Sequence, residues 1–245
     1  MTTAGTRGPL RRFHEKFIVE ERPMPASARR TLFVIAIALV VVGLVAFLVI
    51  LDSVRESDDL SVIDEPVQGW IEGFRSPPMT VVMAIVATVF GPIVLPVIVL
   101  VTTLWWGFAA KHAWRPILLA VAMIVGVASV QILAPVIGRE RPPISSMLLD
   151  IDHTPSFPSG HVMGATDFLL ITTFLVFSRR RNPISTVVAF VVAVVLVLAT
   201  AASRVYLGYH WPTDVLASMS LSLVVLGGVI AVDTWRTARV EPSGD

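Results

Sequence analysis

The sequence of 245 residues contains no cysteine and only two lysines, and just 15% of its residues are charged. Without cysteine the chain forms no disulfide, has no thiolate nucleophile and offers no thiolate ligand to a metal. The formal net charge is +1, which is far from the strongly basic field expected of a nucleic-acid-binding protein. A soluble globular domain carries about 25% charged residues, so this shortage of charge argues for a membrane protein.

Apolar residues take the place of the missing charge. The sequence is 55% hydrophobic and has a mean hydropathy of +0.78. Residues 31–51 are uncharged and long enough to cross about 30 Å of hydrocarbon as a helix. A cleavable signal peptide is the alternative, but its apolar core is usually about 7–15 residues, so we predict a retained anchor. Further apolar stretches follow at 79–109, 116–137, 161–178, 184–203 and 213–232.

We therefore predict an all-α fold, a polytopic membrane bundle of about six transmembrane helices. The stretch 79–109 is too long for one straight span, and we expect a break near Gly91 and Pro92. The sequence shows no internal repeat and no second domain. The predicted organisation is a basic cytoplasmic tail (1–30), a six-span membrane domain (31–232) and a short cytoplasmic tail (233–245).

The basic residues predict the orientation of these spans. Fourteen of the nineteen Lys and Arg residues fall on the side of the two termini, which the positive-inside rule places in the cytoplasm. The loop 52–78 on the opposite side is acidic. Arg139, Arg141 and Arg204 stand at span ends on that outer side, where basic residues are disfavoured. An anion bound at the outer membrane face would explain all three.

One outer-side segment, Pro-Ser-Gly-His at 158–161, has the features of an anion site. Ser159 is a good helix N-cap, and Gly160 lets a ligand approach the backbone where the first helical amides are free. His161 lies beside these amides and can donate or accept a proton near neutral pH. Taken alone, such a turn is usually only a helix cap.

A second segment, 203–214, combines Arg204 with His210 and Asp214. The last two are four residues apart and share a face if they are helical. A carboxylate that holds one ring nitrogen leaves the other free as a base or nucleophile, although such a pair is often only a structural hydrogen bond. With Arg139 and Arg141 nearby, the groups suit phosphoryl transfer through a covalent histidine.

These motifs resemble the type 2 phosphatidic acid phosphatase family, which is related to the vanadium-dependent haloperoxidases. The family pattern is Lys-x6-Arg-Pro, then Pro-Ser-Gly-His, then Ser-Arg-x5-His-x3-Asp. The second and third motifs are complete at 158–161 and 203–214, and the resemblance covers about 79–232. The first motif keeps Arg141 but has Ala134 at the lysine position. We expect Arg139 to replace that lysine, with His153 as a weaker candidate.

The resemblance implies a role for each matching residue. His210 would attack phosphorus and form a phosphohistidine, Asp214 would orient it, and His161 would protonate the leaving group. The phosphate oxygens would be held by Arg141, Arg204, Ser159 and the Gly160 amide, with Arg139 in place of the lysine. The family requires no metal and no cofactor.

The expected function is hydrolysis of a lipid phosphate or diphosphate at the outer membrane face by an integral membrane enzyme. Candidate substrates are polyprenyl diphosphate, phosphatidate and phosphatidylglycerophosphate, so the partners are this lipid and the bilayer. A haloperoxidase would share the motifs but is soluble. A catalytically weakened or non-enzymatic relative, for transport or lipid binding, stays open because of Ala134. Asp167, inside a span, is either a partner of a site arginine or proton path, or a bundle-facing carboxyl that is hydrogen-bonded or protonated.

Overall fold

The computed structural model describes residues 21–110, 112–180 and 182–240. Much of the two predicted tails lies outside these residues, and the first and last long helices extend about five residues beyond the predicted spans. The described chain is almost entirely helical, as predicted. Its elements are β1 (Arg22–Met24), α2 (Ala26–Glu56), η2 (Asp59–Ile63), α3 (Asp64–Glu72), α4 (Pro77–Val89), α5 (Val94–Ala110), α6 (Trp114–Ile137), η3 (Ile144–Ser146), α7 (Gly160–Thr166), the π-helical turn η4 (Asp167–Ile171), α8 (Thr172–Phe177), α9 (Pro183–Tyr206), α10 (Pro212–Thr237) and β2 (Ala238–Val240).

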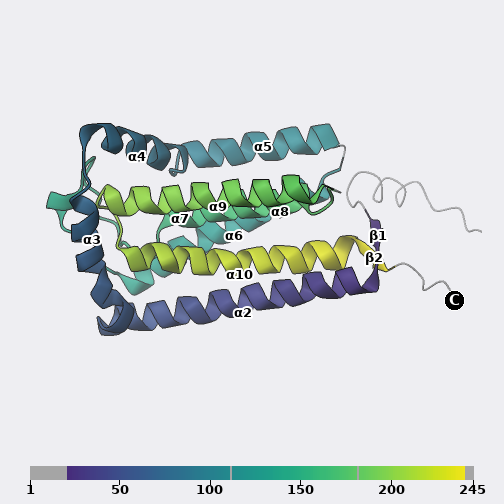
Figure 1. Cartoon of the computed structure of the whole chain (residues 1–245), viewed down its shortest axis with the longest axis horizontal. Coiled ribbons are helices and arrows are strands. Elements are labelled where there is room, and N and C mark those ends of the chain that lie inside the picture. Colours follow the sequence, from purple (N-terminus) through teal and green to yellow (C-terminus); the bar gives the residue numbers. More distant parts are fainter. Residues whose placement is uncertain (1–20, 111, 181, 241–245) are drawn as a thin grey trace, which may run out of the picture.

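The long helices lie side by side and form the predicted membrane bundle (Figure 1). Within the described residues, five helical segments are long and apolar enough to cross a membrane, and α4 with α5 forms a sixth candidate bent by 49°. The bend contains Gly91 and Pro92, as predicted, because proline has no amide hydrogen to continue the helical ladder. Many large aliphatic side chains are exposed on the outer faces of these helices, which suits lipid better than water.

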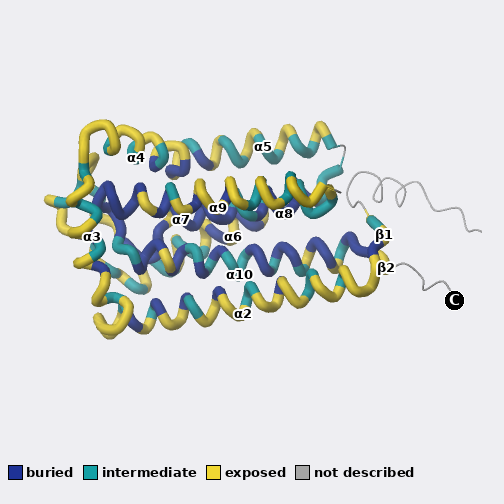
Figure 2. Tube along the Cα trace, in the orientation of Figure 1, coloured by how far each residue is buried: buried dark blue, intermediate teal, exposed yellow. Residues whose placement is uncertain are grey.

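Small residues bring α2 and α10 into close contact. A Cβ atom on Gly43 would lie 2.5 Å from the carbonyl oxygen of Ser220, and one on Gly227 would lie 2.6 Å from that of Ala36. Membrane helices associate through such close packing because lipid tails provide no hydrophobic drive between helices. Figure 2 shows the result: α10 is largely buried in the bundle, whereas α2 and α5 are exposed along much of their length.

The end of the bundle that carries β1 and β2, here called the strand end, is held by a buried ion pair. Arg115 and Asp233 are each 4% exposed, and their side chains meet at 2.9 Å. Trp114 Nε1 donates to the other oxygen of Asp233 at 3.0 Å. Both described chain ends lie here, because β1 pairs with β2 in parallel (Figure 1).

At the opposite end, here called the α3 end, α3 runs across the ends of the long helices (Figure 1). Its buried face is tied to the bundle by Gln68, whose side-chain amide donates to the carbonyl of Val205 at 3.2 Å. Arg75, just after α3, donates to the carbonyls of Tyr206 and Ser146 at 3.0 and 2.8 Å. Helix α3 is therefore docked over the loops in which the predicted site residues lie.

Candidate active site

The three polar segments that the sequence singles out meet at the α3 end. Ser156 links two of them, because its amide donates to the carbonyl of Arg139 at 2.9 Å and its hydroxyl to that of Glu140 at 3.1 Å. The third segment is held by a tight turn at Gly208, which has φ +80°. A Cβ atom there would lie 2.1 Å from the Ser146 carbonyl oxygen, so only glycine fits.

His210 is held in one tautomer by its two neighbours. Its Nδ1 lies 2.7 Å from the carbonyl oxygen of Ser156, which can only accept a hydrogen bond. Its Nε2 lies 3.3 Å from Nη1 of Arg141, which can only donate. Both contacts require the proton on Nδ1, so the lone pair is on Nε2. Asp214 is further from the ring, with Oδ2 at 3.5 Å from Nδ1.

His210 is 3% exposed, and this burial is the largest influence on the pKa of its ring. Burial lowers the pKa of His210 from 6.5 to about 4; the hydrogen bond and charge of Asp214 oppose this shift, and the charges of Arg204 and Arg141 add to it. The imidazole is therefore neutral at pH 7. A neutral ring with a free Nε2 lone pair is the form that a histidine nucleophile requires.

Asp214 is fully buried at the first turn of α10. Its Oδ2 accepts from the backbone amide of Trp211 at 2.9 Å, which is half of a capping box. Its Oδ1 accepts from Nη1 of Arg139 at 2.5 Å. The second amino group of Arg139 donates to Asp64 at 2.6 Å. Arg139 is thus committed to two carboxylates, so its contacts favour holding Asp214 over the phosphate contact predicted from the sequence.

Arg141 lies on the Nε2 side of His210. Its Nη1 donates to the carbonyl of Tyr209 at 2.6 Å, and its Nε to that of Thr154 at 2.7 Å. Nη2 forms an ion pair with Asp152 at 2.8 Å. Burial acts to raise the pKa of Asp152, but hydrogen bonds from Thr154 and the charge of Arg141 outweigh it and hold that pKa below its usual value.

A cavity of about 390 Å³ opens beside these groups, between the α4–α5 bend, the loop around Asp152 and the motif residues. His161, Arg204 and Tyr209 line it. Arg204 is 5% exposed, and its guanidinium lies 4.4 Å over the Tyr209 ring and, within the described residues, forms no ion pair. Its Nε is buried without a hydrogen-bond partner, as is Oγ of the fully buried Ser159. Buried polar atoms are rarely left unpaired, and Arg204 also lines the cavity, so its guanidinium is placed to take an anion there.

Helix α7 begins at Gly160, as the motif predicts, but Ser159 does not cap it with its side chain. The buried hydroxyl therefore has no hydrogen-bond partner among the described residues, and Ser159 does not line the cavity. Gly91, in the α4–α5 bend, lies close by: a Cβ atom there would be 3.5 Å from Nε2 of His161. The site thus receives residues from the bend as well as from the three motifs.

The other residues noted in the sequence lie apart from this cluster. His153 is exposed. Asp167 is buried in the π-helical turn, where it packs so closely on Gly126 that a Cβ atom there would lie 2.1 Å from Oδ2. Both carboxyl oxygens lack a hydrogen-bond partner, and no described arginine pairs with them. Asp167 therefore does not partner a site arginine. The described residues also contain no group of three or more His, Asp or Glu placed to hold a metal ion.

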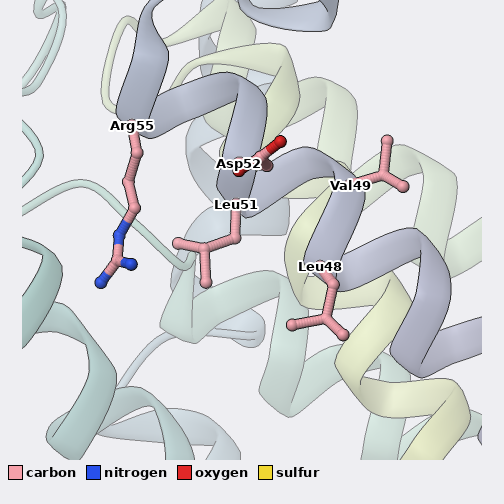
Figure 3. Close-up of a pocket in the computed structure, with 5 residues that line it drawn as sticks. All are labelled: Leu48, Val49, Leu51, Asp52 and Arg55. Carbon is pink, nitrogen blue, oxygen red and sulfur yellow. The ribbon is translucent and has the colours of Figure 1, made fainter.

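A second hollow of about 390 Å³ lies along α2 (Figure 3) and is lined by five residues of that helix. Asp52 and Arg55 point in different directions from the helix, and the remaining three residues are apolar. Nothing in it converges on a ligand. The chemistry of the chain is thus concentrated at the motif cluster.

Ser156 and Asp64 are among the residues of the cluster that were not predicted from the sequence. Ser156 contacts His210 through its backbone carbonyl. Every residue type has this group, so the sequence gives no signal for the contact. Asp64 is one of seven acidic residues in the 52–78 loop, and only its position at the start of a short helix distinguishes it. A capping preference for Asp in the first turn was the one available signal.

Fold and site together define a polytopic helical membrane protein with a histidine, carboxylate and arginine site at one end of its bundle. The model of the PAP2 superfamily matches residues 115–238, about half of the chain. The chain therefore belongs to this superfamily, as a member of the type 2 phosphatidic acid phosphatase family, and the resemblance seen in its motifs is confirmed.

Individual relatives agree with the family match. Phosphatidylglycerophosphatase B of Bacillus subtilis (strain 168) is 28% identical over 190 residues, which are 75% of this chain and 90% of that protein. Phosphatidylglycerophosphatase B of Escherichia coli (strain K12) is 36% identical over 87 residues, which are 35% of this chain and only 30% of that protein.

Two crystal structures are similar in fold. A transmembrane PAP2-type phosphatidylglycerolphosphate phosphatase from Bacillus subtilis superimposes with a TM-score of 0.69 at 26% identity, over 78% of this chain and 96% of that one. LpxE of Aquifex aeolicus has a TM-score of 0.53 at 20% identity, over 69% and 94%. The second similarity shows the shared fold alone.

Proposed function

We propose that this chain is a membrane phosphatase that hydrolyses a lipid phosphate or diphosphate through a phosphohistidine intermediate, without a metal. His210 is the nucleophile, Asp214 supports its ring, and His161 is the proton donor. The phosphate is held by Arg141, Arg204, Ser159 and the Gly160 amide.

The observation that carries the proposal is the buried Arg204 guanidinium, which lines the cavity and forms no ion pair with any residue that the structure describes. An isolated buried cation is costly, so a site of this kind is stable only when an anion pairs with it. The orphaned Oγ of Ser159 adds a hydrogen-bond donor. A phosphate group supplies both the charge and the acceptor oxygens that these residues lack.

The groups allow a balanced two-step reaction. The Nε2 lone pair of His210 attacks phosphorus, and the bond from phosphorus to the lipid oxygen breaks. His161, which takes up a proton when the phosphate anion binds beside it, gives that oxygen the proton. Water then attacks the phosphohistidine, inorganic phosphate leaves, and the proton from water passes to His161. In the transition state of each step the phosphoryl oxygens carry negative charge, and the arginines stabilise this charge.

The position of the cavity supports a lipid as the substrate. It lies at the end of the bundle next to exposed apolar residues, including Ile93 and Ile151, so acyl or prenyl chains can remain in the bilayer. The names of the relatives favour phosphatidylglycerophosphate within this class.

The proposed active-site face is extracytoplasmic. Support comes from the charge distribution: of the described basic residues, the strand end carries Arg22, Arg29, Arg30, Arg115, Arg179, Arg180, Arg236 and Arg239. Because the chain has no cysteine, single substitutions test this directly. A membrane-impermeant maleimide added to intact cells should label Trp70→Cys, on the exposed side of α3, and not Arg236→Cys. The reverse result would place the site in the cytoplasm.

The enzymatic function is tested by phosphate release from phosphatidate, phosphatidylglycerophosphate and polyprenyl diphosphate in detergent. We expect release that is insensitive to a chelator and abolished by His210→Ala. A second candidate, a non-enzymatic lipid-binding relative, follows from Ala134 at the lysine position of the first motif. No release from any of the three lipids, with binding retained, would favour that alternative.

A further inference from the structure

Asp64 lies outside the residues matched by the family model, yet it contacts Arg139 and Thr213, the neighbours of the proposed catalytic residue Asp214. It begins α3 and is 3% exposed. Its Oδ1 accepts from the backbone amide of Thr213 at 2.9 Å, and its Oδ2 from the Thr213 hydroxyl at 2.5 Å. The same Oδ2 accepts from Nη2 of Arg139 at 2.6 Å.

These contacts form one continuous chain of charges. Nη1 of Arg139 donates to Asp214 at 2.5 Å and to the Thr213 hydroxyl at 2.8 Å. The guanidinium of Arg139 therefore bridges two buried carboxylates. Asp214 lies next to His210, and Asp64 lies on the far side of Arg139 from Asp214. The planar fork of arginine suits this bridge, because its two amino groups donate in fixed directions. The order is Asp64, Arg139, Asp214, His210.

The charges of these four residues indicate how the row of contacts could support the attack by His210. Two carboxylates and one guanidinium sum to one negative charge, and His210 is neutral in the resting state. When Nε2 attacks phosphorus, the ring gains positive charge. If Arg139 paired with Asp214 alone, it would neutralise the carboxylate that faces the ring. Sharing Arg139 with Asp64 leaves that carboxylate negative.

We propose that Asp64 and Arg139 are a positioning pair for the nucleophilic histidine, acting through Asp214 and not on the phosphate. This inference deepens the proposed function and rests on it. Asp64 comes from α3, so the docking of α3 across the bundle becomes a requirement for catalysis. The pair also assigns a role to Arg139 that is distinct from replacing the missing lysine.

The test compares Asp64→Asn with Glu65→Gln in the detergent-solubilised full chain, with phosphatidate as the probe. Both changes replace a carboxylate by an amide in the first turn of α3, but Glu65 is exposed. We expect Asp64→Asn to lower kcat about 10- to 100-fold with KM nearly unchanged, since it removes support needed only in the transition state. Glu65→Gln should leave both constants as in the wild type.

A double-mutant cycle separates positioning from simple structural support. If Asp64 acts through Arg139, then Asp64→Asn should cause little further loss of kcat in an Arg139→Gln background. Independent, multiplying losses would overturn the inference, as would an effect of Asp64→Asn on KM alone. If Asp64→Asn does not fold, Arg139→Lys decides. It keeps the cation but not the fork, so kcat should fall, whereas a rise in KM alone would identify a phosphate ligand.

The outcome is distinguishable from failure of the proposed function. If the wild-type chain releases no phosphate, the function fails and the positioning pair is judged by ¹⁵N NMR of the His210 ring. Asp64→Asn should move the His210 ring signals while Glu65→Gln leaves them in place. Unmoved signals in Asp64→Asn would refute the coupling.

Discussion

The Nδ1 atom of His210 lies 2.7 Å from the carbonyl oxygen of Ser156, closer than the 3.5 Å that separates it from Asp214. A backbone carbonyl, therefore, and not only the carboxylate of the motif, fixes the proton on this nitrogen. The carbonyl holds the tautomer through geometry, while Asp214 supplies negative charge beside the ring. The first prediction concerns this tautomer.

The His210 ring should be neutral, with the proton on Nδ1, at pH 7 and down to about pH 5, because its pKa is lowered to about 4 by burial. Ring ¹⁵N NMR of labelled protein in detergent checks this, with His210→Gln assigning the signal. A ring that gains its proton near pH 6.5 would contradict it.

The same shift makes stability depend on pH. The unfolded chain binds this proton below about pH 6.5 and the folded chain only below about 4, so folding favours the neutral form. The stabilisation is complete above pH 6.5 and is lost as the pH falls toward 4. It amounts to at most about 3 kcal/mol. The difference in melting temperature between wild type and His210→Gln, followed from pH 7 to 4, should change with this sign.

His161→Ala should separate substrates by their leaving groups. We expect kcat/KM for phosphatidate to fall about 10²- to 10⁴-fold, the usual contribution of a general acid. The loss should be far smaller with p-nitrophenyl phosphate, whose leaving group needs no proton. Equal losses with both compounds would mean that His161 holds the phosphate and is not the proton donor.

Arg204→Gln should lower activity without harming the fold. If Arg204 holds the phosphoryl group as proposed, removing its charge should cost about 10²- to 10³-fold in kcat/KM. The unliganded protein should be equally or more heat-stable, because a buried charge without a partner is removed. Arg55→Gln, which changes an exposed arginine near the end of α2, is the matched control and should change neither property. A large loss of stability in Arg204→Gln would show that its charge is already satisfied in the fold.

Gly227→Ala should destabilise the contact between α2 and α10. The added methyl would lie 2.6 Å from the Ala36 carbonyl oxygen, so the helices must separate, at about 1–3 kcal/mol. Gly228→Ala is the control, because no neighbouring atom lies within 4 Å of its Cβ position. It should be neutral or slightly stabilising, as alanine favours helix. Thermal unfolding in detergent compares the two, and similar melting temperatures for both variants would refute the close packing.

The helical fold of this protein could largely be predicted from the sequence, because a lipid bilayer allows few kinds of backbone structure. Apolar runs such as 31–51 must be helical in a bilayer, where each backbone polar group needs an internal partner. Proline at 92 predicted the break between α4 and α5, and the motif spacing predicted the family.

The contacts of single residues were less predictable. Arg139 was expected at the phosphate because it is a cation two residues from Arg141, but spacing does not reveal where a long side chain turns. In the folded chain it turns to Asp64 and Asp214. Asp64 is 75 residues from Arg139 and 149 residues from Thr213 in the sequence, and no local pattern predicts such contacts.

The sequence by itself thus determined the helices, the family and the chemical groups available, since these depend on hydropathy and on short-range spacing. Only the tertiary structure decided which atoms pair. It placed Ser156 against one ring nitrogen of His210 and left the buried Nε of Arg204 without a hydrogen bond among the described residues. Such pairings join residues that are far apart in the sequence. The packing of the helices across the whole bundle determines where the loops that carry these residues meet.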